Sequence, residues 1–135
     1  MRFIIYRPLK GYKYQLKRDA SIDCGIHGKS IETEYLKLSL DGTLLVKRGY
    51  CWDGPSGISI DTKTFMRGSL FHDAGYQLLR TGLDPEYKDQ FDALLKRICL
   101  DDGMSSFRAW YVYKAVQLFG GGHIKPKPST TLVAP

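Results

Sequence analysis

The sequence predicts an α+β protein: antiparallel strands in the first half, then three helices packed on the sheet. Two observations lead to this prediction. Residues 1–52 contain short apolar or alternating segments, which are typical of strands. Residues 64–120 contain three segments whose apolar residues are spaced three or four apart, and glycine, proline or serine separates them.

Two strands are expected near the start of the chain. The run RFIIY at residues 2–6 is apolar, and YKYQLK at residues 12–17 alternates aromatic or apolar side chains with polar ones. The following stretch, DASIDCGIHGKS at residues 19–30, contains two glycines and is expected to be a loop.

A hairpin is the clearest strand element. Its strands are expected at residues 36–40 and 43–47, joined by Asp41-Gly42, a dipeptide that favours a two-residue type I′ turn. In that register the cross-strand pairs are Leu40 with Thr43 and Leu38 with Leu45.

Three helices are expected in the second half. The first runs from Thr64 to Arg80 and is closed by Gly82, the second begins at Asp84-Pro85 and ends near Leu100, and the third spans about residues 105–119. The apolar stripe of the third helix consists of Phe107, Trp110, Tyr111, Ala115 and Leu118.

The 135 residues are expected to form a single domain at 1–122 with a proline-containing tail at 123–135. Apolar residues make up 43% of the chain, as in globular proteins, and no apolar run is long enough to span a membrane. The short apolar run at the start does not resemble a signal peptide, and the three cysteines have no metal-knuckle spacing. Synthesis in the cytoplasm, with free thiols, is therefore expected.

The net charge of +6 comes from the beginning of the chain. Residues 2–18 contain six basic residues and no acidic one, whereas the remainder is neutral. Tyrosines lie between these basic residues. Such a segment favours contact with nucleic acid or an anionic glycan, although a solvated strand face has the same pattern.

The first helix carries a polar stripe of unusual composition. Its members lie at helical spacing and are Ser69, His72, Asp73, Tyr76 and Arg80. These side chains form hydrogen bonds of fixed geometry, which is typical of a pocket wall or a buried polar network. A partner row on the second helix consists of Asp89, Asp92, Lys96 and Cys99. If the two helices are antiparallel, Asp92 lies near His72 or Arg80.

The loop WDGPSG before the first helix contains glycine and proline, which fix a tight backbone path. Asp53 can then point toward the polar stripe, and Asp61 can cap the helix or its entry turn. Three interpretations stay open: a divalent metal site that activates water, a structural network, or acid–base chemistry without a metal. The metal ligands would be His72, Asp73, Asp92 and Asp61.

Residues 49–120 resemble a family of small phage and prophage proteins of unknown function. The resemblance rests on the signature WDGPS, then DT, then RxSLxHDxxY, followed by an acidic residue in the next helix. The positions carried over are Trp52, Asp53, Gly54, Pro55, Asp61, Arg67, His72, Asp73, Tyr76 and Asp92. Gly75 departs from the family pattern and is expected to loosen the helix. The resemblance implies a phage origin and supplies no reaction.

Two classes of function follow. The chain is either a virion or host-directed binding component that contacts other phage or host proteins, or a small metal-dependent hydrolase. In the first case the protein resides in the host cytoplasm or the virion, and the polar residues form a buried Asp/His/Arg network. In the second case the candidate catalytic residues are His72, Asp73, Asp53, Arg67 and Tyr76.

Overall fold

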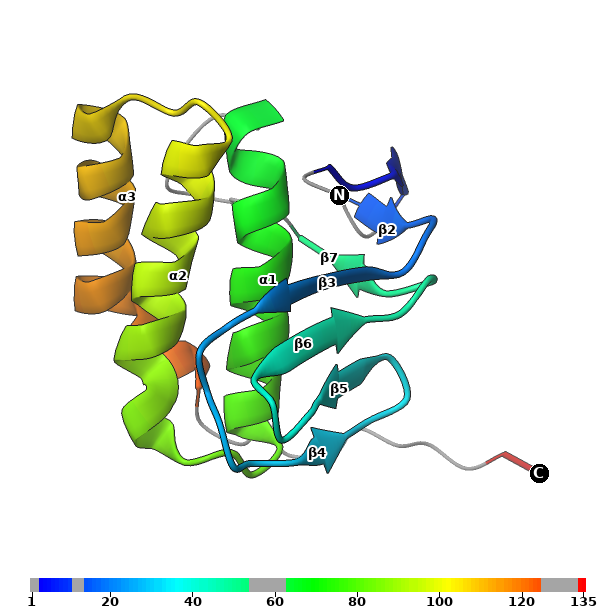
Figure 1. Cartoon of the computed structure of the whole chain (residues 1–135). Helices are drawn as coiled ribbons and strands as arrows, with labels where there is room; N and C mark the ends of the chain where they lie inside the picture. The colour runs from blue at the N-terminus through cyan, green and yellow to red at the C-terminus, as the bar shows by residue number, and fades with distance from the viewer. Residues whose placement is uncertain (1–2, 11–13, 54–62, 125–133) are drawn as a thin grey trace.

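The computed structural model describes residues 3–10, 14–53, 63–124 and 134–135, and it confirms the α+β fold class. Antiparallel strands form two sheets, and three helices follow them in the chain (Figure 1). The helices are α1 (Lys63–Arg80), α2 (Lys88–Asp101) and α3 (Ser106–Phe119). Short 3₁₀ turns at Pro85–Tyr87 and Gly120–His123 precede α2 and follow α3.

The larger sheet has the strand order β3-β6-β5-β4 and supplies most of the buried sheet surface. Its strands are β3 (Ala20–Asp23), β6 (Thr43–Val46), β5 (Leu36–Leu38) and β4 (Ile31–Glu32). The segment that contains β3 was expected to be a loop, and this prediction is wrong. β3 alternates half-buried Ala20 and Ile22 with exposed Ser21 and Asp23, but the alternation spans only four residues beside glycine-containing turns.

The smaller sheet has the order β1-β2-β7 and holds an aromatic cluster. Its strands are β1 (Tyr6–Pro8), β2 (Tyr14–Leu16) and β7 (Cys51–Trp52). The rings of Tyr6 and Tyr14 have centroids 5.9 and 5.6 Å from that of Trp52, and 5.4 Å from each other. Trp52 is buried, so these tyrosines are packed against the core rather than fully free on the surface.

The hairpin at Asp41-Gly42 is present, but its turn and register differ from the prediction. Leu38 pairs with Leu44, and Ser39 and Thr43 close a three-residue loop. Only Gly42 has a positive φ, +89°, so the loop is a type I turn followed by a left-handed glycine. The one-residue shift places Leu36, Leu38, Leu44 and Val46 together in the core and leaves Leu40 exposed.

The helix boundaries follow the local signals in the sequence. Gly82, with φ of +129°, ends α1, and the amide of Leu83 donates to the carbonyl of Leu78. Asp84 caps the 3₁₀ turn before α2 by accepting from the amide of Glu86 at 3.0 Å. Ser105 caps α3 by accepting from the amide of Arg108.

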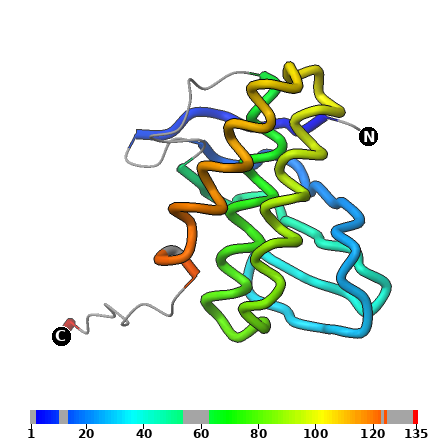
Figure 2. Tube along the Cα trace, turned by 90° about the vertical axis from the view of Figure 1, so that its left-hand side faces the viewer, coloured from blue at the N-terminus to red at the C-terminus, as the bar shows by residue number. Residues whose placement is uncertain are grey.

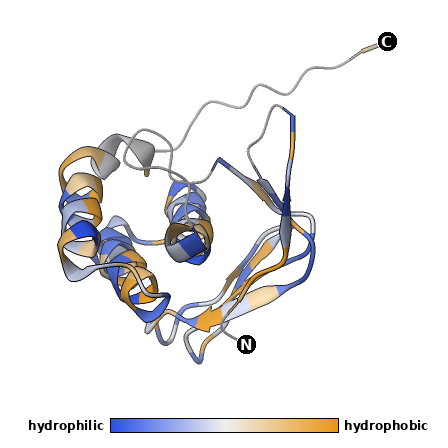
Figure 3. Ribbon diagram, turned by 90° about the horizontal axis from the view of Figure 1, so that it is seen from above, coloured by the Kyte–Doolittle hydropathy of each residue, from blue (hydrophilic) through white to orange (hydrophobic). Residues whose placement is uncertain are grey.

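α1 is the central element, between the larger sheet and the other two helices (Figures 1 and 3). It is buried on nearly every side, which explains why its polar residues need internal partners. Gly75 does not merely loosen this helix. A Cβ at Gly75 would overlap the ring of Phe91 in α2, so glycine is what allows α1 and α2 to approach.

α3 packs on α1 and α2, away from the sheet (Figure 2). Its buried residues are the small Ala109, Val112 and Val116. The expected apolar stripe does not face the core: Phe107, Trp110, Tyr111 and Leu118 are exposed, and Ala115 is only half-buried. The predicted packing face of α3 is therefore wrong.

The expected tail at 123–135 falls mostly on residues 125–133, outside the described residues. The described residues up to Ile124 form two hydrophobic clusters. One lies between the sheets, α1 and α2, and the other lies between the three helices. α1 and α2 contribute to both clusters.

Candidate functional site

The buried carboxylate of Asp92 is the centre of the polar site. Asp92 lies on α2 and is fully buried. Its Oδ1 accepts from the hydroxyl of Tyr76 at 2.6 Å and lies 2.8 Å from Nε2 of His72. Both partners are on α1, one turn apart, and their rings pack with centroids 4.1 Å apart. The predicted approach of Asp92 to His72 is therefore confirmed.

Lys88 links this pair of helices to the third. Its ammonium donates to Oδ2 of Asp92 at 2.7 Å and also reaches the carbonyl oxygens of Val116 and Gln117, at 3.2 and 3.5 Å. These carbonyls belong to the last turn of α3, where the negative end of the helix dipole favours a positive charge. The cluster of His72, Tyr76, Lys88 and Asp92, which we call the Asp92 network, thus joins α1, α2 and α3.

The titration behaviour of the network favours an ion cluster. Burial alone would raise the pKa of the Asp92 carboxyl, but the bonds to His72, Lys88 and Tyr76 hold it below its ordinary value. Burial alone would lower the pKa of the His72 imidazole, but the carboxylates of Asp73 and Asp92 raise it. Asp92 is therefore ionised, and the protonated form of His72, donating from Nε2, is favoured.

Asp73 and Asp53 form the more open side of the site. Oδ1 of Asp73 lies 3.9 Å from Nδ1 of His72, and its side chain is 34% exposed. Partial burial raises the pKa of the Asp73 carboxyl, and the charge of Asp53 adds to this effect. Burial and the charge of Asp73 likewise raise the pKa of Tyr50. Asp53 is itself exposed, at the end of β7.

Arg67 lies apart from the Asp92 network. Its guanidinium pairs with both oxygens of Asp102, just beyond the end of α2, at distances of 3.0–3.3 Å. Both side chains are mostly buried. Ser69 is also directed elsewhere, because its hydroxyl accepts from the indole of Trp52 at 3.1 Å. The predicted stripe therefore divides: His72 and Tyr76 bind Asp92, whereas Ser69 binds Trp52.

The metal hypothesis receives no support from the described part of the chain. There, no three His, Cys, Asp or Glu side chains are arranged to hold a metal ion. Both oxygens of Asp92 already accept hydrogen bonds, and the ammonium of Lys88 would repel a cation. Asp61 lies outside the described residues, so a site that combines it with Asp73 stays a prediction.

Sequence reasoning missed Lys88 and Asp102. Lys88 stands four residues before Asp92 on α2, the spacing at which oppositely charged side chains meet on a helix, so a signal was present. Asp102 follows the last residue of α2, and no basic residue stands three or four positions before it. Its pairing with Arg67 depends on the antiparallel packing of α1 and α2.

The basic N-terminal segment is only partly described. Nε of Arg7 donates to Oε1 of Gln15 at 2.9 Å across the β1–β2 pair, whereas Arg2 and Lys13 lie outside the described residues. Contact with nucleic acid or a glycan through residues 2–18 stays a prediction. No helix in the described ranges is long and apolar enough to cross a membrane.

Comparisons of the chain with protein-family models, with curated proteins and with solved structures found no match.

Proposed function

We propose that this chain is a phage-derived binding component, either of the virion or directed at a host protein, and that the outer face of α3 is its contact surface. The observation that carries the proposal is the exposure of large apolar side chains on α3. Phe107, Leu118 and Phe119 are 76%, 74% and 76% exposed, and Trp110 and Tyr111 are about half exposed. Single exposed apolar residues are common, but five on one helix are typical of an interaction site.

The chemistry of this face suits a protein partner. Aromatic side chains are enriched at protein interfaces because they contribute a large contact area with few rotatable bonds. α3 contains Arg108 and Lys114 and no acidic residue. A partner surface with apolar pockets and an acidic rim would complement it, and two copies of the same basic face would repel each other.

The Asp92 network supports this proposal as a scaffold. Lys88 holds the last turn of α3 against α1 and α2, and the buried face of α3 offers only small side chains. Without the network, the buried area of α3 alone would anchor it weakly. A fixed α3 presents its aromatic face in one orientation, which reduces the entropy lost on binding.

Site-specific photocrosslinking tests the contact surface. A benzoylphenylalanine at position 107 should yield one discrete crosslinked protein in bacteria that carry the chain with its own phage genes. The same group at Leu40, which is 63% exposed on the β5–β6 turn, is the matched control and should not yield it. Equal products at both positions, or none at position 107, would contradict the proposal.

The partner identified in this way should bind the purified chain directly. Phe107→Ser together with Leu118→Ser should weaken that binding at least about tenfold, because truncating central interface anchors has this effect. Since both side chains are exposed, the melting temperature should change little. An immunoblot of purified virions then distinguishes a virion component from a host-directed protein.

One observation favours the hydrolase as a second candidate. Asp92 orients His72, whose Nδ1 faces the partly exposed Asp73, and Asp53 contributes charge nearby. An imidazole oriented by a carboxylate is a common acid–base arrangement, and here the second nitrogen faces another carboxylate that is partly exposed. Metal analysis of protein prepared without chelators tests the metal form. One bound manganese, magnesium or zinc per chain, lost in Asp73→Ala, would favour the hydrolase.

A further inference from the structure

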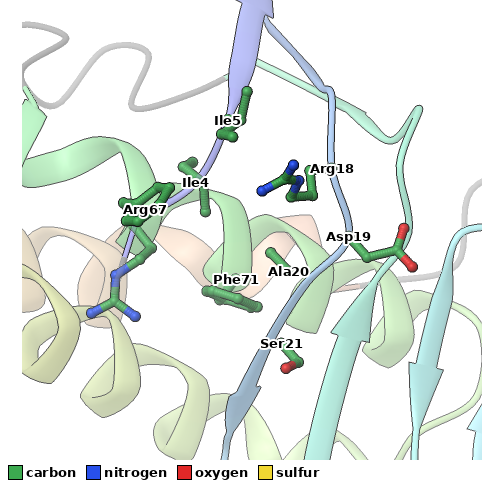
Figure 4. Close-up of a pocket in the computed structure, with 9 residues that line it drawn as sticks. Ile4, Ile5, Arg18, Asp19, Ala20, Ser21, Arg67 and Phe71 are labelled. Atoms are coloured by element: carbon green, nitrogen blue, oxygen red, sulfur yellow. The ribbon is translucent and has the colours of Figure 1, made fainter. Parts of the chain in front are cut away.

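A cavity of about 220 Å³ lies between the N-terminal residues, the start of β3 and α1, away from the Asp92 network. It is lined by Phe3, Ile4, Ile5, Arg18, Asp19, Ala20, Ser21, Arg67 and Phe71. Ile4, Ile5 and Phe71 form an apolar wall around the end of the Arg18 side chain (Figure 4). The cavity therefore combines apolar side chains with polar ones, two of which are arginines, and its accessible lining is more polar than apolar.

Arg18 supplies the positive charge of the cavity without neutralisation. Its guanidinium points toward Ile4 and Ile5 (Figure 4), and no carboxylate of the described residues forms an ion pair with it. The neighbouring Asp19 points the other way, and its Oδ1 accepts from the amide of Arg48 at 2.7 Å. Arg67 is already paired with Asp102, so its charge is compensated.

The apolar lining is incompletely covered by the protein. Phe3 is 57% exposed and Ile5 is 41% exposed, although both lie at a cavity whose floor, Phe71, is fully buried. Covering such side chains with an apolar group is favourable because it removes apolar surface from water. A ligand that covers Phe3 and Ile5 and reaches Arg18 would satisfy both chemistries.

We infer that this cavity binds a small organic anion in which an acidic head group carries a short apolar tail. The head group would accept two hydrogen bonds from the planar guanidinium of Arg18, which matches a carboxylate or phosphate. The tail would lie along Ile4, Ile5 and Phe71. The volume is below that of sites for drug-sized ligands, so the tail must be short.

This site is independent of the proposed contact surface on α3. α3 contributes none of the residues that line the cavity. Loss of ligand binding and loss of the partner contact are therefore separate outcomes, each measured with its own variants.

Titration of the full-length protein with hexanoate tests the inference by two-dimensional amide NMR. Hexanoate should produce saturable shifts at Ile4, Ala20 and Phe71. Hexanol, which keeps the tail without the charge, and inorganic phosphate, which keeps the charge without the tail, should each bind at least about tenfold more weakly. Hexanol binding as well as hexanoate would overturn the role of the charge. Phosphate binding as well as hexanoate would overturn the role of the tail.

Three variants locate the site. Arg18→Ala should weaken hexanoate binding at least about tenfold, and Arg18→Lys should weaken it less, because lysine keeps the charge and loses the fork geometry. Arg48→Ala removes the same charge from an exposed neighbour that does not line the cavity, and it should leave the affinity within about twofold. Arg18 is exposed, so its variants should fold, and their spectra check this. Unchanged affinity in Arg18→Ala, or no saturable shift in the native chain, would refute the site.

Discussion

Replacing Asp92 with alanine should destabilise the fold more than any surface substitution. The change removes a fully buried carboxylate and leaves the ammonium of Lys88, the imidazole of His72 and the hydroxyl of Tyr76 without their common acceptor. Removing one partner of a buried ion pair typically costs about 3 to 5 kcal/mol, because the remaining charge is stranded. Asp92→Asn keeps an acceptor and loses the charge, so we expect a smaller loss of about 1 to 3 kcal/mol.

Thermal unfolding followed by far-ultraviolet circular dichroism measures this effect. For a domain of this size, each kcal/mol corresponds to about 4 °C, so Asp92→Ala should lower the melting temperature by about 12 to 20 °C. Asp89→Ala is the matched control: it makes the same change on the same helix at an exposed position, and we expect a decrease of no more than about 4 °C. If the two variants melt within a few degrees of each other, the network does not hold the helices together and the reasoning is refuted.

Three further predictions follow from individual residues. Gly75→Ala should cost about 1 to 3 kcal/mol in urea unfolding, because its methyl group would overlap the ring of Phe91, and a stabilised variant would contradict the close approach of the helices. Gly42→Val should cost about 1 kcal/mol or more, because φ is +89° there, and an unchanged melting temperature would count against the left-handed turn. Because the folded-state pKa of His72 is raised, protonated His72 stabilises the fold below its unfolded pKa near 6.5, and this contribution is lost as the pH rises through the folded value. The stability difference between the native chain and His72→Gln should therefore shrink as the pH rises above about 6.5, and a difference that grows with pH would contradict the assigned charge state.

The sequence predicted the elements whose signals are local. The cap at Ser105 and the helix end at Gly82 depend on bonds to residues a few positions away, and both are present. Asp84 also acts as a cap, but it caps a 3₁₀ turn at Pro85–Tyr87, and α2 begins at Lys88. The pairing of Asp92 with His72 could also be predicted, because a short connection makes α1 and α2 antiparallel neighbours.

The errors come from choices that only tertiary packing decides. On α3, the aromatic residues and the small residues both recur at helical spacing, so periodicity alone could not select the buried face. The small side chains of Ala109, Val112 and Val116 allow α3 to pack closely on α1 and α2, and the aromatic side chains are then left outside. Gly75 was misinterpreted for the same reason, because its role depends on a ring of another helix.

The hairpin register shows how one residue in a turn changes the cross-strand pairs. Asp41-Gly42 suits both a two-residue turn and the end of a three-residue loop. Burial decides between them, since the three-residue loop places Leu38 opposite Leu44 and both in the core. The local sequence carries the turn signal but no direct measure of that burial.

Thermal unfolding of His72→Ala, combined with crosslinking at position 107, tests the central claim most directly. If His72 belongs to a scaffold, its removal leaves Asp92 with one bond fewer in a buried site and lowers the melting temperature. Below that temperature the helices remain folded, so the crosslink to the partner should still form. A His72→Ala variant that melts like the native chain but no longer supports phage propagation would contradict the scaffold and would place His72 in an active site.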